Sequence, residues 1–317
     1  MNRLFYVSAL LTSVIGMAGT ATAQTYTDDY VYEDGNYADT WAGIGALNNN
    51  TPTDTNKPVG YGAEGVGSTA VGYEALYSNT TGGYNTAVGA GAIANNSTGT
   101  ANVAVGYSAL YSSTTASYNT SVGHASMEDN TTGAYSVAVG AYALQGDTSG
   151  SDNTALGYAS LSSTTTGYNN SALGAWALEQ NDSGYFNNAS GYYALYGNTS
   201  GYNNNAQGSY ALSANTTGYG NSGMGANSLL NVTTGFRNVA VGNNTGGSLV
   251  AGSYNVDIGW GVTGSGDETG ITRIGNPSYN TVTYIAGVEG AHITGAAVYV
   301  TSSGQLGVLA SSERYKT

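Results

Sequence analysis

The sequence contains no cysteine, three prolines and few charged side chains. Without cysteine the chain forms no disulfide, so an exported form must gain its stability in another way. Lys and Arg number 6 against 19 Asp and Glu, and the formal net charge is −13. This balance argues against nucleic acid as a partner, because phosphate binding needs clustered cations. So few acids and bases also argue against an enzyme with a charged active site, and we expect no cofactor.

Glycine and tyrosine are abundant, with 49 and 28 residues in a chain of 317. Such a composition is unlike that of a helix-rich enzyme, because glycine is a poor helix former. Hydrophobic residues make up 40% of the chain, which argues against disorder.

The N-terminus has the pattern of a secretory signal peptide. Arg3 supplies a positive charge, residues 4–15 an apolar run, and Ala21–Ala23 a small-residue cleavage site. We therefore expect residues 1–23 to be removed before Gln24, and the protein to be exported to the cell surface, the outer membrane or the extracellular space. No later stretch resembles a membrane-spanning helix.

A glycine recurs with a fixed spacing of 17 residues from Gly72 onward. Around Gly89 the unit carries Asn85 four residues before, Ala87 two before and an apolar residue, Ile93, four after, and most other units repeat this pattern. A fixed period without drift is typical of a solenoid. Seventeen residues rich in Gly, Asn and Thr are too few for two helices, so we predict an all-β, parallel β-solenoid.

Each coil is expected to contain a short strand (T-A-V-G), a second short stretch (x-x-A-L) and a polar turn. Neighbouring residues of a strand point to opposite faces, so Ala87 and Val88 belong to different faces. Both rows are mostly apolar along the repeats, although the second row weakens at Ser190 and Gln207. A thin coil has one interior, so the second row predicts packing against another copy of the chain.

The units "NTAVG" and "NVAVGYSAL" resemble the head repeats of YadA-like trimeric adhesins. The resemblance covers residues 60–260 and implies a left-handed β-roll with three chains side by side, a homotrimer. This repeat is longer than the usual one. It is closer to the variety that precedes an endosialidase-type intramolecular chaperone in fibre proteins.

The C-terminal sequence resembles the link into that chaperone, which cuts itself from the fibre. The resemblance implies cleavage between Ala310 and Ser311, with Ser311 as nucleophile and Lys316 as base. A lysine becomes a base when burial lowers its pKa. With the body of the chaperone missing, we expect no activity here.

The resulting domain organisation has four parts after the signal peptide. We expect an acidic lead or cap over 24–59, the repeats over 60–260, a neck over 261–310 and the start of a missing chaperone domain over 311–317.

Tyrosines are the candidate ligand-binding residues, because they are common at interfaces. One row precedes the strands: Tyr84, Tyr118, Tyr135, Tyr168, Tyr185, Tyr202 and Tyr219. The alternative is that these rings stack on each other between coils.

Other sites are not expected from the sequence. His124 and His292 lack a nearby ligand motif, so we predict no metal site, and His124 occupies a slot that tyrosine fills elsewhere. Asp does not recur at a fixed position, which argues against repeated calcium sites. The Asn-x-Ser/Thr sequences at Asn79, Asn96, Asn130, Asn198 and Asn215 are attributed to turn chemistry rather than glycosylation.

We therefore predict an exported, non-enzymatic, trimeric structural or adhesive fibre of the cell surface, which contacts host or surface glycans or matrix proteins. One alternative is a phage-type tail-fibre shaft with a cleavable chaperone, and another is a carbohydrate-binding solenoid. An ice-binding solenoid is disfavoured, because that class needs a flat, regular array of threonines on one face. Here the threonines are concentrated in turns, and we expect their positions in the repeat to be irregular. A surface lyase is disfavoured because no acid or base recurs on one face.

Overall fold

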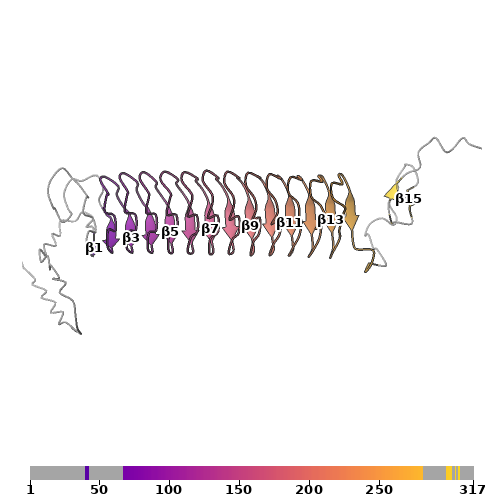
Figure 1. Ribbon diagram of the computed structural model, residues 1–317, viewed down its shortest axis with the longest axis horizontal. Coiled ribbons are helices and arrows are strands. Elements are labelled where there is room, and N and C mark those ends of the chain that lie inside the picture. Colours follow the sequence, from indigo (N-terminus) through magenta and orange to yellow (C-terminus); the bar gives the residue numbers. More distant parts are fainter. Residues whose placement is uncertain (1–39, 43–66, 281–297, 302–303, 305, 308–317) are drawn as a thin grey trace, which may run out of the picture.

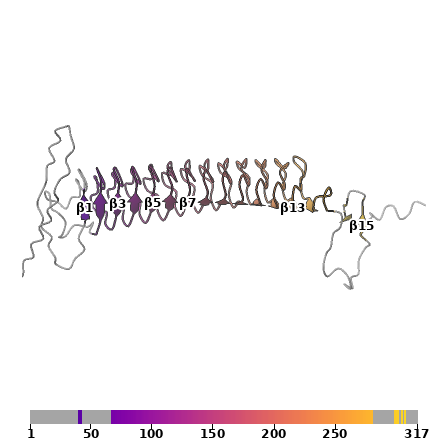
Figure 2. The same ribbon diagram turned by 90° about the horizontal axis from the view of Figure 1, so that it is seen from below.

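The chain folds as a parallel β-solenoid, in a computed structural model that describes residues 40–42, 67–280, 298–301, 304 and 306–307. Figures 1 and 2 show the strands stacked side by side along a narrow rod. Fourteen strands form one sheet in sequence order, each paired in parallel with the next. The predicted fold class is therefore confirmed.

The strands of this sheet are three residues long, and those from β2 to β13 follow one another at the repeat period. They are β1 (Thr40–Ala42), β2 (Thr69–Val71), β3 (Thr86–Val88), β4 (Val103–Val105), β5 (Thr120–Val122), β6 (Val137–Val139), β7 (Thr154–Leu156), β8 (Ser171–Leu173), β9 (Asn188–Ser190), β10 (Asn205–Gln207), β11 (Ser222–Met224), β12 (Val239–Val241), β13 (Val256–Ile258) and β14 (Thr272–Ile274). A separate antiparallel pair, β15 (Tyr299–Val300) and β16 (Leu306–Gly307), follows.

The register places equivalent residues of successive coils beside each other. Ala87 pairs with Ala104, for example, and Val88 with Val105. The sheet therefore turns each repeated residue of the sequence into a straight column along the rod. The sheet continues past residue 260, because β14 pairs with β13.

A glycine ends each strand from β2 to β13, where the backbone adopts a conformation that residues with a side chain rarely occupy. At Gly174 φ is +137°, and a Cβ atom there would lie 2.6 Å from the carbonyl oxygen of Gly191 in the next coil. The recurring glycine of the sequence is therefore required by both the turn and the close stacking of coils.

The core is built from small and medium apolar columns. The middle residue of the strand, such as Ala104 or Ala138, is fully buried. A second column of larger side chains fills the rest of the core and is also fully buried. This leucine column consists of Leu76, Ile93, Leu110, Met127, Leu144, Leu161, Leu178, Leu195, Leu212 and Leu229.

The x-x-A-L stretch is not a strand. Its leucine-column residues have φ between 50° and 54°, in the left-handed region. The stretch still bonds from coil to coil, because the Leu76 amide donates to the Ala92 carbonyl at 3.0 Å and the Ile93 amide to Ala109 at 2.9 Å. Backbone hydrogen bonds thus join the coils here as well as in the sheet.

Asparagine side chains form a second set of bonds between coils. The asparagine column includes Asn85, Asn102 and Asn119, and the backbone amides of Asn102 and Asn119 each donate to the side-chain Oδ1 of the asparagine in the preceding coil at 3.0 Å. The Asn102 side chain also donates to the Ala116 carbonyl at 2.7 Å. These buried side chains satisfy backbone groups inside the coil.

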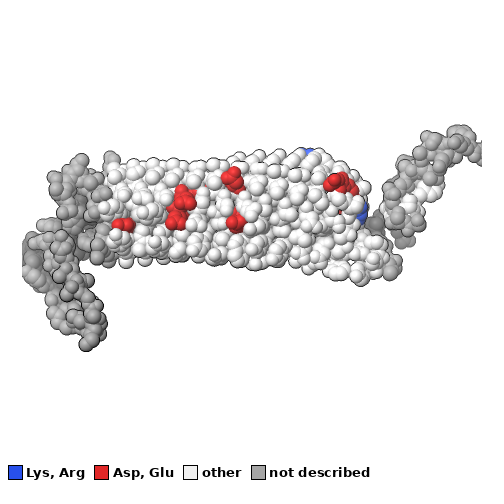
Figure 3. Space-filling view, viewed as in Figure 1, with Lys and Arg blue, Asp and Glu red and all other residues white. Residues whose placement is uncertain are grey.

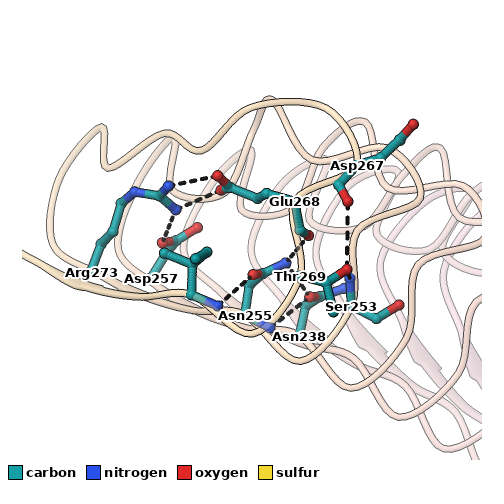
Figure 4. Close-up of polar contacts among 9 residues, drawn as sticks. Asn238, Ser253, Asn255, Asp257, Asp267, Glu268, Thr269 and Arg273 are labelled. Carbon is teal, nitrogen blue, oxygen red and sulfur yellow. Dashed lines mark hydrogen bonds and ion pairs between the residues drawn. The ribbon is translucent and has the colours of Figure 1, made fainter. Parts of the chain in front are cut away.

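Charged residues close the C-terminal end of the solenoid (Figure 4). Asp257 stands at the buried middle position of β13, and Arg273 at the same position of β14. The Arg273 guanidinium is 3.5 Å from Asp257 Oδ1 and binds both carboxylate oxygens of Glu268, at 2.5 and 2.6 Å. We call these three residues the C-terminal cap.

Candidate interaction surface

The outer face of the sheet presents an apolar column, the last residue of each strand. Val105 is 37% exposed, Val139 38% and Leu173 52%. The valine column consists of Val71, Val88, Val105, Val122, Val139, Leu156, Leu173, Met224, Val241 and Ile258 and is interrupted by Ser190 and Gln207. The alternation expected from the sequence is confirmed, because the neighbouring alanines are buried while this column is not.

The tyrosines predicted as one row form two columns. Tyr84, Tyr118 and Tyr135 directly precede the asparagine column, whereas Tyr168 and its successors lie one residue earlier in the coil. The single row of the sequence interpretation is wrong, because a shift of one residue moves a side chain to a different column.

The later tyrosines stack on each other in a nearly parallel series. The tyrosine ladder consists of Tyr168, Tyr185, Tyr202, Tyr219 and Phe236. Ring centroids are 4.8–5.1 Å apart and the planes differ by no more than 5°. Tyr185 and Tyr202 each have a parallel ring on both sides, so their faces are covered. Of these candidates, Tyr118 and Tyr135 also stack, at 5.2 Å.

A second aromatic series follows the strand-ending glycines. The tryptophan strip consists of Tyr107, His124, Tyr142, Tyr158, Trp176, Tyr192, Tyr193 and Tyr210. From Tyr107 to Tyr210 it has at least one ring in every coil, with centroids of contacting rings 4.5–5.7 Å apart. The continuity of this series is not evident from the sequence, because the ring changes between two adjacent positions of the repeat.

His124 is part of this strip. Its ring stacks on Tyr107 at 5.2 Å and meets Tyr142 edge-on. The interpretation that it replaces a tyrosine at the surface is confirmed, since its side chain is exposed.

Charges are sparse on the solenoid. Figure 3 shows isolated acidic groups on a surface that is otherwise largely uncharged, with basic atoms toward the C-terminal end. Arg237 lies over the rings of Tyr219 and Tyr254, at 5.9 and 5.5 Å from their centroids. A neutral partner therefore fits most of this surface better than an anionic one.

The asparagines of the Asn-x-Ser/Thr sequences are buried within the coils. Asn96 donates to Asn79 Oδ1 at 2.7 Å and to the Gly99 carbonyl at 2.9 Å. All five are fully buried: Asn79, Asn96, Asn130, Asn198 and Asn215. Turn chemistry therefore accounts for these residues, and the folded coil leaves no space for a glycan on them.

The buried asparagines of these turns occupy one position of the repeat, which we call the turn-asparagine column. Asp147 stands at this position in its coil. Its Oδ1 accepts from the Gly150 amide at 2.7 Å, while Oδ2 is buried without a hydrogen-bond partner. Burial raises the pKa of this carboxyl to about 7, although hydrogen bonds from the Gly150 and Ser149 amides and from Asn153 act to lower it.

The turn threonines are regular in phase, which corrects the expectation from the sequence. Thr114, Thr131 and Thr148 are equivalent, and each hydroxyl donates to the backbone carbonyl of the same position in the next coil. The residue that follows is exposed, as at Thr115 and Thr132. A single exposed column is not the flat array that an ice-binding face needs. An ice-binding function is therefore disfavoured by the lack of a flat array and not by irregular positions of the threonines.

Several predicted residues lie outside the described part of the chain. These are the signal peptide with its cleavage site, His292, Ser311 and Lys316. Among the described residues, no group of three or more His, Cys, Asp or Glu could hold a metal ion. The described part also contains no helix long and apolar enough to cross a membrane.

Comparison with known proteins yields no relative. The chain matches no protein-family model, no curated protein sequence and no solved structure.

Proposed function

We propose that this protein is an exported, non-enzymatic surface fibre whose solenoid packs against two sister chains and serves in adhesion. The observation that carries this proposal is the valine column, a line of partly exposed apolar side chains along the outer face of the sheet. A single chain leaves this column in water, whereas a homotrimer would bury it.

The energies are compatible with assembly along the whole rod. Fully burying one valine or leucine is worth about 1.5–3 kcal/mol, and association costs about 4–15 kcal/mol. The side chains of the column are already partly buried, so each supplies only a fraction of that value. Summed from β2 to β13, with the interruptions at Ser190 and Gln207, the gain is of the same order as the cost.

The rod and the predicted export support a role outside the cell. A stack of short coils extends a surface over a long distance with few residues per unit of length, as a stalk or adhesive head requires. The resemblance to YadA-like adhesin repeats agrees with this role.

The first test is the molar mass of the exported chain in solution, measured by light scattering. We expect three times the mass of one chain. A stable monomer would overturn the trimer and leave the valine column without a partner.

A pair of variants identifies the face that assembles. Val105→Lys with Val139→Lys places two charges in the valine column and should reduce the trimer to monomers. Thr132→Lys with Ser149→Lys places the same charges on exposed turn residues and should leave the mass unchanged. Equal effects of the two pairs would contradict the assignment of the interface.

A further inference from the structure

We infer that the tryptophan strip binds a neutral, extended polysaccharide that lies along the rod, with its sugar rings packed on the aromatic side chains. This inference deepens the proposed adhesive function by naming the chemical class that is bound. It uses a different surface from the valine column.

Five of the eight rings of the strip are exposed, and the other three are half-buried. Tyr107 is 60% exposed, Tyr158 46% and Tyr192 43%. Tyr158 meets Tyr142 and Trp176 at interplanar angles of 81° and 70°, so it has no parallel neighbour among them. Tyr192 likewise meets Trp176 at 85°. Tyr158 and Tyr192 are therefore not sandwiched and can contact the carbon–hydrogen faces of a sugar, whereas Trp176 is half-buried and has a stacked ring on one face.

The tyrosine ladder differs in this respect. Its inner rings, Tyr185 and Tyr202, have parallel rings on both sides. Such rings present mainly edges and hydroxyls to solvent. The ladder is therefore a matched control, with the same residue type at the same coil period but with covered faces.

The continuity of the strip indicates a linear polymer. At least one ring occurs in each coil from Tyr107 to Tyr210. Successive coils are about 4.8 Å apart, the spacing of strands in a sheet. This period is close to the length of one sugar unit in an extended chain, so successive sugars can meet successive coils.

Polar groups beside the strip provide partners for sugar hydroxyls. Tyr196 contacts Tyr193, with ring centroids 4.7 Å apart, and belongs to the column that also holds Glu128 and Glu179. Gln145, in the same column, donates to Glu128 at 2.8 Å. Carboxylates and amides bind hydroxyl groups, and carboxylates repel anionic polymers. The expected ligand is therefore uncharged.

The test uses affinity gel electrophoresis of the exported full chain. The gels contain hydroxyethyl cellulose or galactomannan as neutral polymers, or carboxymethyl cellulose as the anionic counterpart of the first. We expect retardation by at least one neutral polymer and none by the anionic one. No retardation by either neutral polymer, or equal retardation by the anionic polymer, would overturn the inference.

Two double variants assign the site. Tyr158→Ala with Tyr192→Ala should weaken binding at least about tenfold, since each of these exposed rings supplies a stacking contact. Tyr185→Ala with Tyr202→Ala removes two rings of the ladder and should leave the affinity unchanged. A loss of affinity in the ladder variant alone would place the site there instead.

Fluorescence provides a readout that does not depend on how well these variants fold. Trp176 lies within the strip, so the neutral polymer should change its emission in a Trp260→Phe chain and not in a Trp176→Phe chain. An unchanged emission in the first chain would count against binding at the strip.

Failure of the inference can be distinguished from failure of the proposed assembly. A trimer that binds no neutral polymer leaves the fibre proposal standing and removes the glycan. A monomer that binds the polymer at the strip overturns the trimer and leaves the glycan-binding inference standing.

Discussion

At the residue scale, the leucine that fills the core of each coil has an uncommon backbone conformation. Leu110 and Leu144 have φ of 54° and 52° and are fully buried. The left-handed region costs a residue with a side chain about 1–2 kcal/mol, and burial of leucine returns about 1.5–3 kcal/mol. Burial thus offsets local strain, which a propensity argument cannot reveal.

Asp147 leads to a prediction about pH. Its pKa is about 7 in the folded protein and about 4 in an unfolded chain. Between these values the native state binds more protons, so the free energy of unfolding should fall as pH rises through this window, by up to about 4 kcal/mol. Asp147→Asn should restore the amide donor of the column. It should raise the unfolding temperature at pH 8, with little effect at pH 4.

The control for this prediction is Asp152→Asn, in which an exposed carboxylate of the same coil is neutralised. It should change thermal stability little at either pH. A similar gain from both substitutions at pH 8 would attribute the effect to net charge rather than to burial of Asp147.

Gly174 leads to a second prediction at this scale. Gly174→Ala would place a Cβ 2.6 Å from the Gly191 carbonyl oxygen at a φ of +137°, and should destabilise the solenoid by more than about 2 kcal/mol. Denaturant unfolding measures the loss. Gly247→Ala is the comparison, because its nearest atom would be 3.8 Å away, and a loss as large there would contradict the steric explanation.

At the scale of the element, each coil is held to the next by side chains as well as by backbone. Asn187 Nδ2 donates to Gly201 at 2.8 Å, and its Oδ1 accepts from the Asn204 amide at 3.0 Å. The sequence shows the recurrence of asparagine, but not that each one bonds the following coil. That bond exists only when the coils are stacked in register.

The asparagine column yields a prediction from two adjacent residues. Asn187→Ala leaves the Asn204 amide without this partner and removes one of the two side-chain donors to the Gly201 carbonyl, and should cost about 1–3 kcal/mol. Asn188 is exposed on β9, and its contact to Asn205 is 3.5 Å long, so Asn188→Ala should cost less than about 0.5 kcal/mol. Denaturant unfolding of the two variants measures this difference. Equal losses of stability would contradict the prediction.

At the scale of the whole molecule, the C-terminal cap ends the apolar core with charge. Burial raises the pKa of Asp257, and the nearby Arg273 acts in the opposite direction. The hydrogen bonds from Arg273 are the main reason that the pKa of Glu268 is lowered. A solenoid end needs such closure, because exposed strand edges pair with other chains.

The cap gives the last prediction. Arg273→Ala leaves the buried Asp257 carboxylate without its cation, so the final coils should open locally. Hydrogen exchange at the amides of residues 256–262 should become faster, while exchange near β5 stays the same. Arg237→Ala removes an exposed arginine and should leave exchange in both regions near the wild-type rates; faster exchange there too would contradict a role specific to the cap.

The sequence by itself determined the coil. The fixed glycine spacing predicts the solenoid, and the alternation of Ala87 and Val88 predicts which column is buried, because both follow from the local geometry of a strand. Only the tertiary structure decided how columns meet. It covered the faces of the tyrosine ladder and joined Asp257 to Arg273. These features depend on contacts between residues a full coil apart, which no local pattern specifies.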